Sequence, residues 1–381
     1  MGILSALGIT SNNRSVKAQY APAVMNDGYG FSGVGNTFGY GPMDRALAMQ
    51  VPAVARCRNL IAGVISYLPL ELYKKSTGAE LGSPVWLEQP DIRQPRSVTI
   101  SATVDSLIFY GVAYWRVTEV YADDLRPSRF EWVSNLRVNA QLNPKGTEVM
   151  YYTIDGLQVP MSGPGSLITF QGLIQGVLQT AGRTIQSALD IERAAAVAAQ
   201  TPMATGYLKN TGADLPEDHV QGLLATWKAS RASRSTAYLT STLSYESVGF
   251  SPKDMMYNEA SQYLATQIAR AMNVPAIYIS ADMNGSYTYQ NSVENRKEFV
   301  SYSLQPYLCA IEDRLSMNDV TASGNTVRFN ISETFLRSDD KTRLETIEKM
   351  LSLGLIDVEQ AKEMEDLTPN GNESTDATYV Q

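Results

Sequence analysis

One histidine, two cysteines and a few adjacent acid pairs are the side chains of this 381-residue sequence that could do covalent or metal chemistry. His219 follows Pro216-Glu217-Asp218, a pattern typical of the start of a charged helix, so we expect a solvent-exposed ring. Cys57 and Cys309 lie far apart, each among apolar neighbours, and we expect two buried free thiols of a reducing compartment. Because a structural zinc site needs four closely placed ligands, we expect no metal site.

The acid pairs do not indicate general acid–base catalysis. Asp123-Asp124 and Asp339-Asp340 are neighbours in the chain, and neighbouring side chains diverge on both strands and helices. No phosphate-binding loop, zinc-protease, serine-hydrolase or calcium-loop motif occurs. We therefore expect no enzyme and no cofactor. An enzyme whose scattered carboxylates are brought together by folding stays open as an alternative.

A literal G-x-G-x-x-G occurs at Gly28, Gly30 and Gly33, with Asn-Asp before it and more glycine and Pro42 after it. A dinucleotide site requires a strand before these glycines and a helix after them. The region has neither pattern, so we interpret residues 1–46 as a flexible N-terminal arm.

The charge distribution argues against a protein that grips nucleic acid. The chain has 31 Lys and Arg against 39 Asp and Glu, a net charge of −8. Eleven acids and four bases lie between residues 338 and 381, so this segment carries −7 and the remainder is nearly neutral. Tight binding to phosphates needs clustered cations. The most basic cluster (Lys228, Arg231 and Arg234) is either a solvated helix face or a contact for a partner protein or DNA phosphates.

No pattern of a membrane protein or a targeting signal is found. No apolar run approaches the ~18 residues that span a bilayer. The first residues lack the basic start of a secretory signal, and Ala6 stands where a myristoylation motif has Ser or Thr. We expect no membrane partner.

Hydrophobic periodicity predicts an α+β protein. In the first part we expect a helix beginning near Val51, a helix at 98–110, and strands at 68–73, 113–120, 130–133, 137–139 and 150–154. Two long helices are expected next, at 176–202 and from 251 to 272. They flank a small unit with strands at 204–209, 237–240 and 245–250 and a helix at 216–231. The Ala-rich face of the long helices covers either the chain's own core or a neighbouring copy.

The last part is expected to begin with a polar loop and to end in acidic helices. After the loop at 280–291 we expect a helix at 292–315, kinked at Pro306, and a strand at 327–331. Two amphipathic helices follow. Gly354 ends the first, which turns Leu344, Ile347, Met350 and Leu351 inward, and Asp357 caps the second together with Gln360.

Five segments, in order, resemble the portal proteins of tailed bacteriophages. They are VPAVARCRNLIAGVISYLPLELY (51–73), LIFYGVAYWRV (107–117), GFSPKDMMYNEASQYLATQIARAMNVPAIYIS (249–280), NSVENRKEFVSYSLQPYLCAIEDRLS (291–316) and FLRSDDKTRLETIEKMLSLGLIDVEQAKEMEDLTP (335–369). The resemblance implies an α+β portal fold with an α+β wing, two long stem helices flanking a small α/β clip, a tunnel loop and a C-terminal helical crown. Its parts are the arm (1–46), wing (47–175), first stem helix (176–202), clip (203–250), second stem helix (251–279), tunnel loop (280–291), wing helix and strand (292–337), and crown and tail (338–381).

The resemblance also implies a function. Portal proteins form a ring of about twelve copies at one capsid vertex of the virion, after assembly in the host cytoplasm. Double-stranded DNA passes through transiently and without sequence specificity. The implied partners are further copies of the chain, the terminase large subunit, a head–tail adaptor and the major capsid protein. Another head–tail adaptor without a DNA-translocating loop is the alternative within phage proteins.

The candidate site residues fall into three groups. In the tunnel loop, polar and aromatic side chains are expected to face DNA (Asn284, Tyr287, Thr288, Tyr289, Gln290 and Asn291). In the clip, a basic cluster is expected to dock a partner (Lys228, Arg231 and Arg234). In the crown, acids are expected to discourage DNA from sticking to the mouth of the channel (Asp339, Asp340, Glu345 and Glu348).

Overall fold

The computed structural model describes residues 43–143, 149–200, 206–232, 239–247, 257–279, 295–331 and 340–364. Its α-helices are α1 (Arg45–Ala48), α2 (Pro52–Tyr67), α3 (Val85–Glu88), α4 (Arg96–Tyr110), α5 (Val177–Thr180), α6 (Gly182–Gln200), α7 (Glu217–Ala232), α8 (Tyr257–Ala271), α10 (Gln305–Leu315), α11 (Asp340–Ser352) and α12 (Val358–Met364). Two 3₁₀ turns, η2 (Asn135–Arg137) and η3 (Ala276–Ile279), and a π-helical turn, η4 (Phe299–Leu304), complete the helical elements.

The strands form four small antiparallel sheets, in the orders β11-β1-β2, β4-β3-β8, β5-β6-β7 and β10-β9. Their bounds are β1 (Leu70–Lys74), β2 (Glu80–Leu81), β3 (Val112–Val120), β4 (Pro127–Val133), β5 (Val138–Leu142), β6 (Val149–Ile154), β7 (Leu157–Gln158), β8 (Leu167–Gln171), β9 (Gly206–Asn210), β10 (Leu243–Ser247) and β11 (Asn325–Phe329). Helices and small sheets alternate along the chain, so the predicted α+β class is confirmed.

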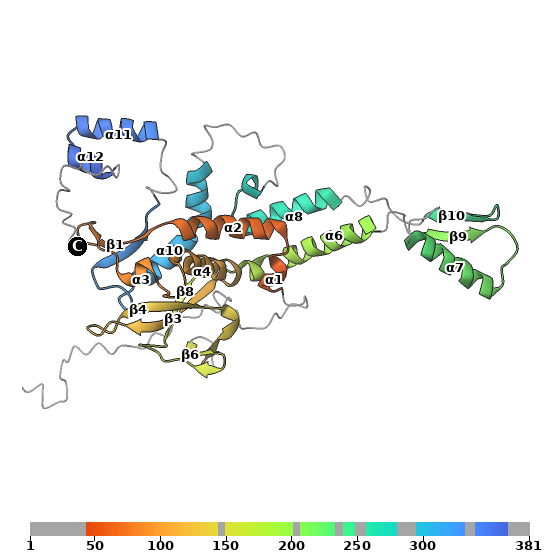
Figure 1. The fold of residues 1–381 in the computed structure, drawn as a ribbon, viewed down its shortest axis with the longest axis horizontal. Coiled ribbons are helices and arrows are strands. Elements are labelled where there is room, and N and C mark those ends of the chain that lie inside the picture. The colour runs from red at the N-terminus through yellow and green to blue at the C-terminus, as the bar shows by residue number, and fades with distance from the viewer. Residues whose placement is uncertain are drawn as a thin grey trace, which may run out of the picture.

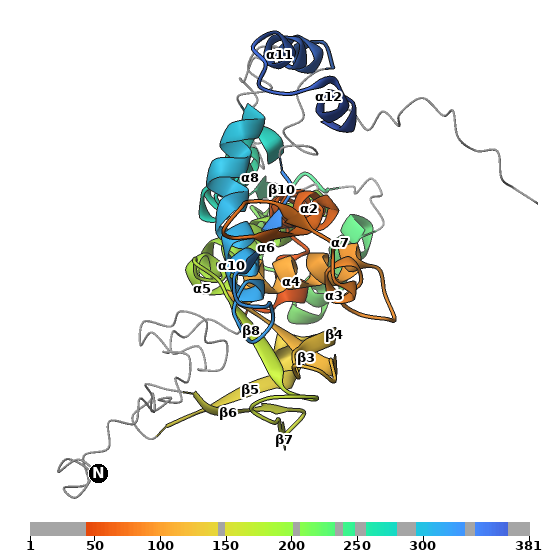
Figure 2. The ribbon, with the colours of Figure 1, turned by 90° about the vertical axis from the view of Figure 1, so that its left-hand side faces the viewer.

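The first half of strand β3, residues 112–115, is buried on both faces because it lies between two hydrophobic clusters. Trp115 points into the main core, where its indole N–H donates to Thr103 Oγ1 of α4 over 2.7 Å. Tyr114, the preceding residue, points to the opposite face and joins a smaller cluster with Ile154 of β6. This arrangement fixes the β5-β6-β7 sheet beneath the β4-β3-β8 sheet (Figure 2).

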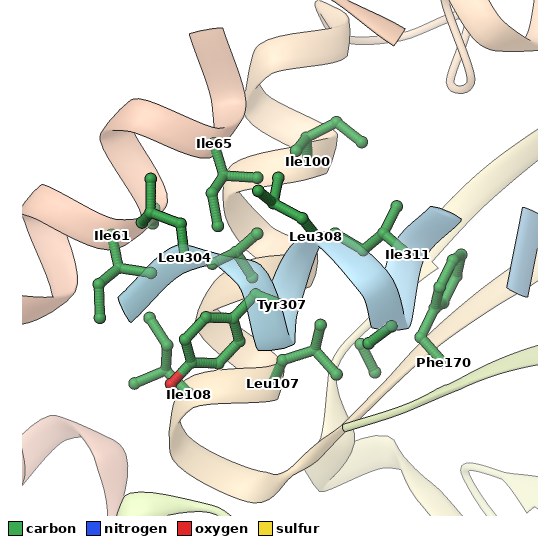
Figure 3. Close-up of a cluster of buried hydrophobic side chains, with 14 of the residues drawn as sticks. Ile61, Ile65, Ile100, Leu107, Ile108, Phe170, Leu304, Tyr307, Leu308 and Ile311 are labelled. Carbon is green, nitrogen blue, oxygen red and sulfur yellow. The ribbon is translucent and has the colours of Figure 1, made fainter. Parts of the chain in front are cut away.

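Helix α10 is the centre of the main core. Leu308 and Ile311 on its inner face are fully buried, as is Leu304, the last residue of η4. Figure 3 shows these side chains and Tyr307 pointing toward α2, α4 and β8 and meeting six labelled side chains there: Ile61, Ile65, Ile100, Leu107, Ile108 and Phe170. Each buried aliphatic side chain contributes about 1.5–3 kcal/mol, so this contact binds the second half of the chain to the first.

The described chain begins slightly before the predicted end of the arm. Asp44 caps α1 by accepting the Leu47 N–H over 2.7 Å, and Arg45 forms an ion pair of 2.6 Å with Asp105 of α4. The described residues therefore include 43–46, the last part of the predicted arm of residues 1–46. Gly28, Gly30 and Gly33 lie outside the described residues.

Four expectations about local structure need correction. The long helix predicted from Gly176 is interrupted at Ala181, where φ is −124° and ψ is 11°, and its first turn is the separate α5. Leu344 is exposed rather than inward, and Cys309 is only half-buried. The predicted strand at 237–240 is not seen in residues 239 and 240, the part of it that the structure describes, and among the described residues β9 pairs only with β10.

No helix in the described ranges is long and apolar enough to cross a membrane.

Close backbone contacts at glycines determine where the first long helix begins. The Gly172 N–H donates to Gly111 O over 2.8 Å, at the left-handed residue that ends α4. A Cβ on Gly176 would lie 2.3 Å from Phe109 O. Since α5 and α6 follow Gly176 directly, their start is fixed against the end of α4.

Replacing Gly176 with Ala should destabilise the protein. Backbone angles of −61° and 142° suit alanine, so the cost is steric and is expected to be about 1–3 kcal/mol of unfolding free energy. The matched control is Gly63→Ala on the exposed face of α2, where no atom lies within 4 Å of the added Cβ. That change should stabilise by about 0.5–1 kcal/mol. Equal unfolding midpoints of the two variants in denaturant would contradict the close contact.

Candidate DNA channel and docking site

Helices α6 and α8 form an antiparallel pair that projects from the body of the molecule (Figure 1). α6 is buried near its start, through Ile185 and Leu189, but Val197 further along is 63% exposed. Tyr263 of α8 is also 63% exposed. The pair therefore presents apolar side chains that the described residues do not cover.

The charges on these two helices balance. α6 carries Arg183 and Arg193 against Asp190 and Glu192, and α8 carries one acid and one base. Arg193 lies 3.7 Å from Asp190, an exposed pair of small energetic weight. With so few cations the helix pair offers no basic track for a phosphate backbone.

Strands β9 and β10 and helix α7 make a small unit beyond the ends of α6 and α8 (Figure 1). Trp227 of α7 packs on Tyr245 of β10 with ring centroids 5.5 Å apart. Lys228 is exposed on α7 and Arg231 lies one turn later on the same helix. Arg234 lies outside the described residues. His219 is exposed on α7, as predicted.

The six predicted loop residues (Asn284, Tyr287, Thr288, Tyr289, Gln290 and Asn291) lie outside the described residues, but the chain on both sides of them is fixed. Tyr278, before the loop, packs against Phe299, after it, with ring centroids 5.2 Å apart. The Tyr278 carbonyl also accepts a hydrogen bond of 3.2 Å from Arg56 Nε of α2. Both ends of the loop segment are thus fixed at one place on the body.

The turn that leads from α8 toward this loop has a specific cause. Asn273 follows α8 with a φ of +55°, in the left-handed region. The Val274 N–H donates to Ala269 O over 2.9 Å and the Asn273 N–H donates to Arg270 O over 3.1 Å, which together make a Schellman C-cap. Asparagine tolerates this conformation better than other side-chain-bearing residues.

Asn273 also makes a side-chain hydrogen bond to Tyr302, and Pro306 explains why this bond forms. A proline has no N–H to donate, so the carbonyl four residues earlier, at Tyr302, loses its helical partner. The chain widens into the π turn η4, and the Tyr302 carbonyl accepts a hydrogen bond from Asn273 Nδ2. Ser303 Oγ donates in return to the Asn273 carbonyl. Sequence analysis missed Asn273, although an asparagine just after an apolar helical run is a known C-cap signal.

The predicted end of α11 and the predicted start of α12 are confirmed. Gly354 has a φ of +66° after α11, and the Leu355 N–H donates to Met350 O over 3.0 Å. Before α12, the Gln360 N–H donates to Asp357 Oδ1 over 2.7 Å, and the Asp357 N–H donates to Gln360 Oε1 over 3.1 Å.

The structure describes three of the four predicted crown acids. Glu345 and Glu348 are exposed on α11, and Asp340 is its first residue. Asp339 lies outside the described residues.

Little in the described ranges indicates covalent or metal chemistry. No group of three His, Cys, Asp or Glu side chains there could hold a metal ion. Burial raises the pKa of the Cys57 thiol to about 12, so the thiolate nucleophile is scarce at neutral pH. The prominent features are instead an unpartnered helix pair, an anchored loop base and small peripheral units.

Asn273 should matter for both its conformation and its side chain. Asn273→Ala puts a residue that tolerates the left-handed region less well than asparagine at this turn, and removes the bond to Tyr302 O, for an expected loss of about 2–3 kcal/mol. Asn273→Gly keeps the turn and removes only the bond, for about 0.5–1.5 kcal/mol. Denaturant unfolding of both variants measures the difference. A glycine variant as unstable as the alanine variant would show that the turn conformation is not what asparagine supplies.

Comparison with known proteins relates this arrangement to one family. A family model described as "Phage portal protein" matches residues 52–366. The crystal structure of an HK97 family phage portal protein from Corynebacterium diphtheriae is similar with a TM-score of 0.62 and 27% identity, over 76% of this chain and 96% of that chain. A chain in the virion of a native gene transfer agent particle has a similar fold, with a TM-score of 0.57 and 19% identity over 89% and 97%.

A chain in the neck of a native gene transfer agent particle, computed with C12 symmetry, shares the fold at a TM-score of 0.55 and 18% identity, over 87% of this chain and 95% of that one. No curated protein sequence matches the chain. The family match runs from α2 to the end of α12 and so includes α6, α8 and both anchors of the loop. The resemblance predicted from five sequence segments is confirmed: the chain belongs to the phage portal protein family.

Proposed function

We propose that copies of this portal protein form a closed ring of about twelve at one capsid vertex, and that double-stranded DNA passes through its centre during packaging and ejection. The carrying observation is the exposed apolar face of the α6–α8 pair. Exposed side chains such as Val197 and Tyr263 are buried in a ring where each pair packs against its neighbours. The C12 symmetry of the related neck particle supports the copy number.

The proposed channel holds DNA weakly. Each phosphate neutralised by a Lys or Arg adds a salt-dependent increment of affinity, and many such contacts would hinder movement of the duplex. In α6 and α8 the cations are Arg183, Arg193 and Arg270, and each helix has no net charge. The tunnel loop (residues 280–291) would add polar and stacking contacts from Asn284, Tyr287 and Tyr289, with Thr288, Gln290 and Asn291 beside them.

The remaining elements are assigned to docking. The unit of β9, α7 and β10 would form the clip, in which Lys228, Arg231 and Arg234 face the terminase large subunit during packaging and a head–tail adaptor afterwards. Helices α11 and α12 would form the crown inside the capsid. The outer wing would meet the major capsid protein. In this role the protein is structural, and the terminase supplies the ATP-driven pumping.

Electron microscopy of the negatively stained full-length protein tests the ring. We expect closed rings with a central hole wide enough for a DNA duplex, because the α6–α8 faces need neighbours. A protein that stays a compact monomer at every concentration, including with capsid protein present, would contradict the proposal.

DNA binding by the assembled ring tests the weak channel. At ~50 mM salt we expect non-specific affinity for double-stranded DNA weaker than micromolar, since phosphate contacts are few. Asn284→Lys and Tyr287→Lys should tighten binding at least tenfold and steepen its salt dependence. Thr118→Lys, on the exposed side of β3, is the control and should change neither. Sub-micromolar binding by the unaltered ring would refute the weak channel while leaving the ring intact.

A further inference from the structure

Two grooves lie on opposite sides of the body. The α2–α4 groove, of about 730 Å³, is lined by α1, α2, α4 and the residues after β4, among them Val98, Asn135 and Leu136. The methionine groove, of about 680 Å³, is lined by β6, β8, α10 and neighbouring loops, among them Met161 and Met317. Figure 2 shows α2, α3 and β4 on one side of the body and α10 and β8 on the other.

Leu136 at the rim of the α2–α4 groove is an unusual surface residue. It is 82% exposed although it sits in the well-formed turn η2, where its N–H donates to Ser134 Oγ over 3.4 Å. Beside it, Asn135 is 5% exposed and donates to Val112 O over 2.7 Å. Asn135 Oδ1 is the one buried side-chain polar atom without a hydrogen-bond partner among the described residues. A rigid apolar knob thus stands next to a buried acceptor that lacks a donor.

The methionine groove has the shape and chemistry to receive such a knob. Met150, Met161, Leu173 and Met317 line it, and each is more than half exposed. Methionine side chains adapt to an inserted apolar group better than branched ones. Gln171, at the end of β8, also lines the groove.

The knob and the groove cannot meet within one copy. Leu136 precedes β5, whereas the pairing of Leu142 with Val149 puts Met150 at the other end of the β5–β6 ladder. Six residues of extended chain separate these ends by roughly 20 Å. In a closed ring each copy turns two different surfaces to its two neighbours, so a feature on one side must meet a feature on the other.

We propose that Leu136 of one copy inserts into the methionine groove of the next copy, and that this contact joins neighbouring wings around the ring. The occupant is a second copy of this chain, which would present its exposed Leu136 side chain to the groove. The inference depends on the proposed ring for its geometry. It adds a defined wing-to-wing contact that the α6–α8 packing does not require.

Directed cross-linking of the full-length protein tests the contact. In a Cys309→Ser background, Leu136→Cys with Met317→Cys should give a ladder of covalent multimers with a short bismaleimide. Each single variant should give none. Cys57 is fully buried and its raised pKa keeps it out of the reaction. Rings that form normally but give no ladder would overturn the contact and leave the ring in place.

Two further outcomes separate the contact from the ring. A ladder without closed rings would support the contact and count against the ring. Neither rings nor ladder would overturn both.

A charge at Leu136 tests the contact independently, through its effect on ring assembly. Leu136→Asp should raise the concentration at which rings assemble about tenfold or more, because burial of an apolar side chain is lost at every joint. Its monomer should unfold at the same midpoint, since the side chain is exposed before assembly. Leu355→Asp, at a 69% exposed leucine between α11 and α12, is the matched control and should leave assembly unchanged. Unaltered assembly of Leu136→Asp would refute the contact.

Discussion

The burial of α10 against α2 and α4 is the contact on which the other functional elements depend. Leu304, Leu308 and Ile311 are removed from water in this contact, and β11 packs beside it. The π turn before α10 carries Phe299, which holds one end of the loop segment, and the helix itself forms one wall of the methionine groove. One apolar contact between distant parts of the sequence therefore positions the loop base and one side of the proposed ring joint.

The base of the loop has a second support, a hydrogen bond that forms because Pro306 lacks a backbone N–H. Because Pro306 cannot donate an N–H, the Tyr302 carbonyl is free to accept from Asn273, and the end of α8 is joined to the start of α10. Proline in a helix usually costs stability, but here the carbonyl left without its helical donor, that of Tyr302, accepts a hydrogen bond from Asn273, just after α8. In a ring of identical copies, loops with both ends held this way start at the same distance from the axis.

Regular elements were predictable from the sequence because their signals are local. Pro52 at the start of α2, Gly111 after α4 and the Asp357–Gln360 capping box were each found where periodicity and capping rules place them. The break at Ala181 was not predictable, since apolar residues continue at helical spacing through it. Gly176, five residues earlier, lies against Phe109 in a close contact that only the folded chain creates. Asn135 and Leu136 were missed because residue type alone predicts neither the burial of this asparagine nor the exposure of this leucine.

In the proposed ring, each copy has to bind its neighbours firmly and the DNA weakly, and the chain would meet these two demands with different surfaces. Exposed apolar side chains lie where copies would meet: Val197 on α6, Leu136 in η2 and the methionines of the methionine groove. These contacts gain from the hydrophobic effect and are insensitive to salt. The helices proposed to line the channel balance their charges instead, so the duplex would meet no strong electrostatic trap. Because ring stability would rest on apolar burial and DNA affinity on cations, a mutation can change one property without changing the other.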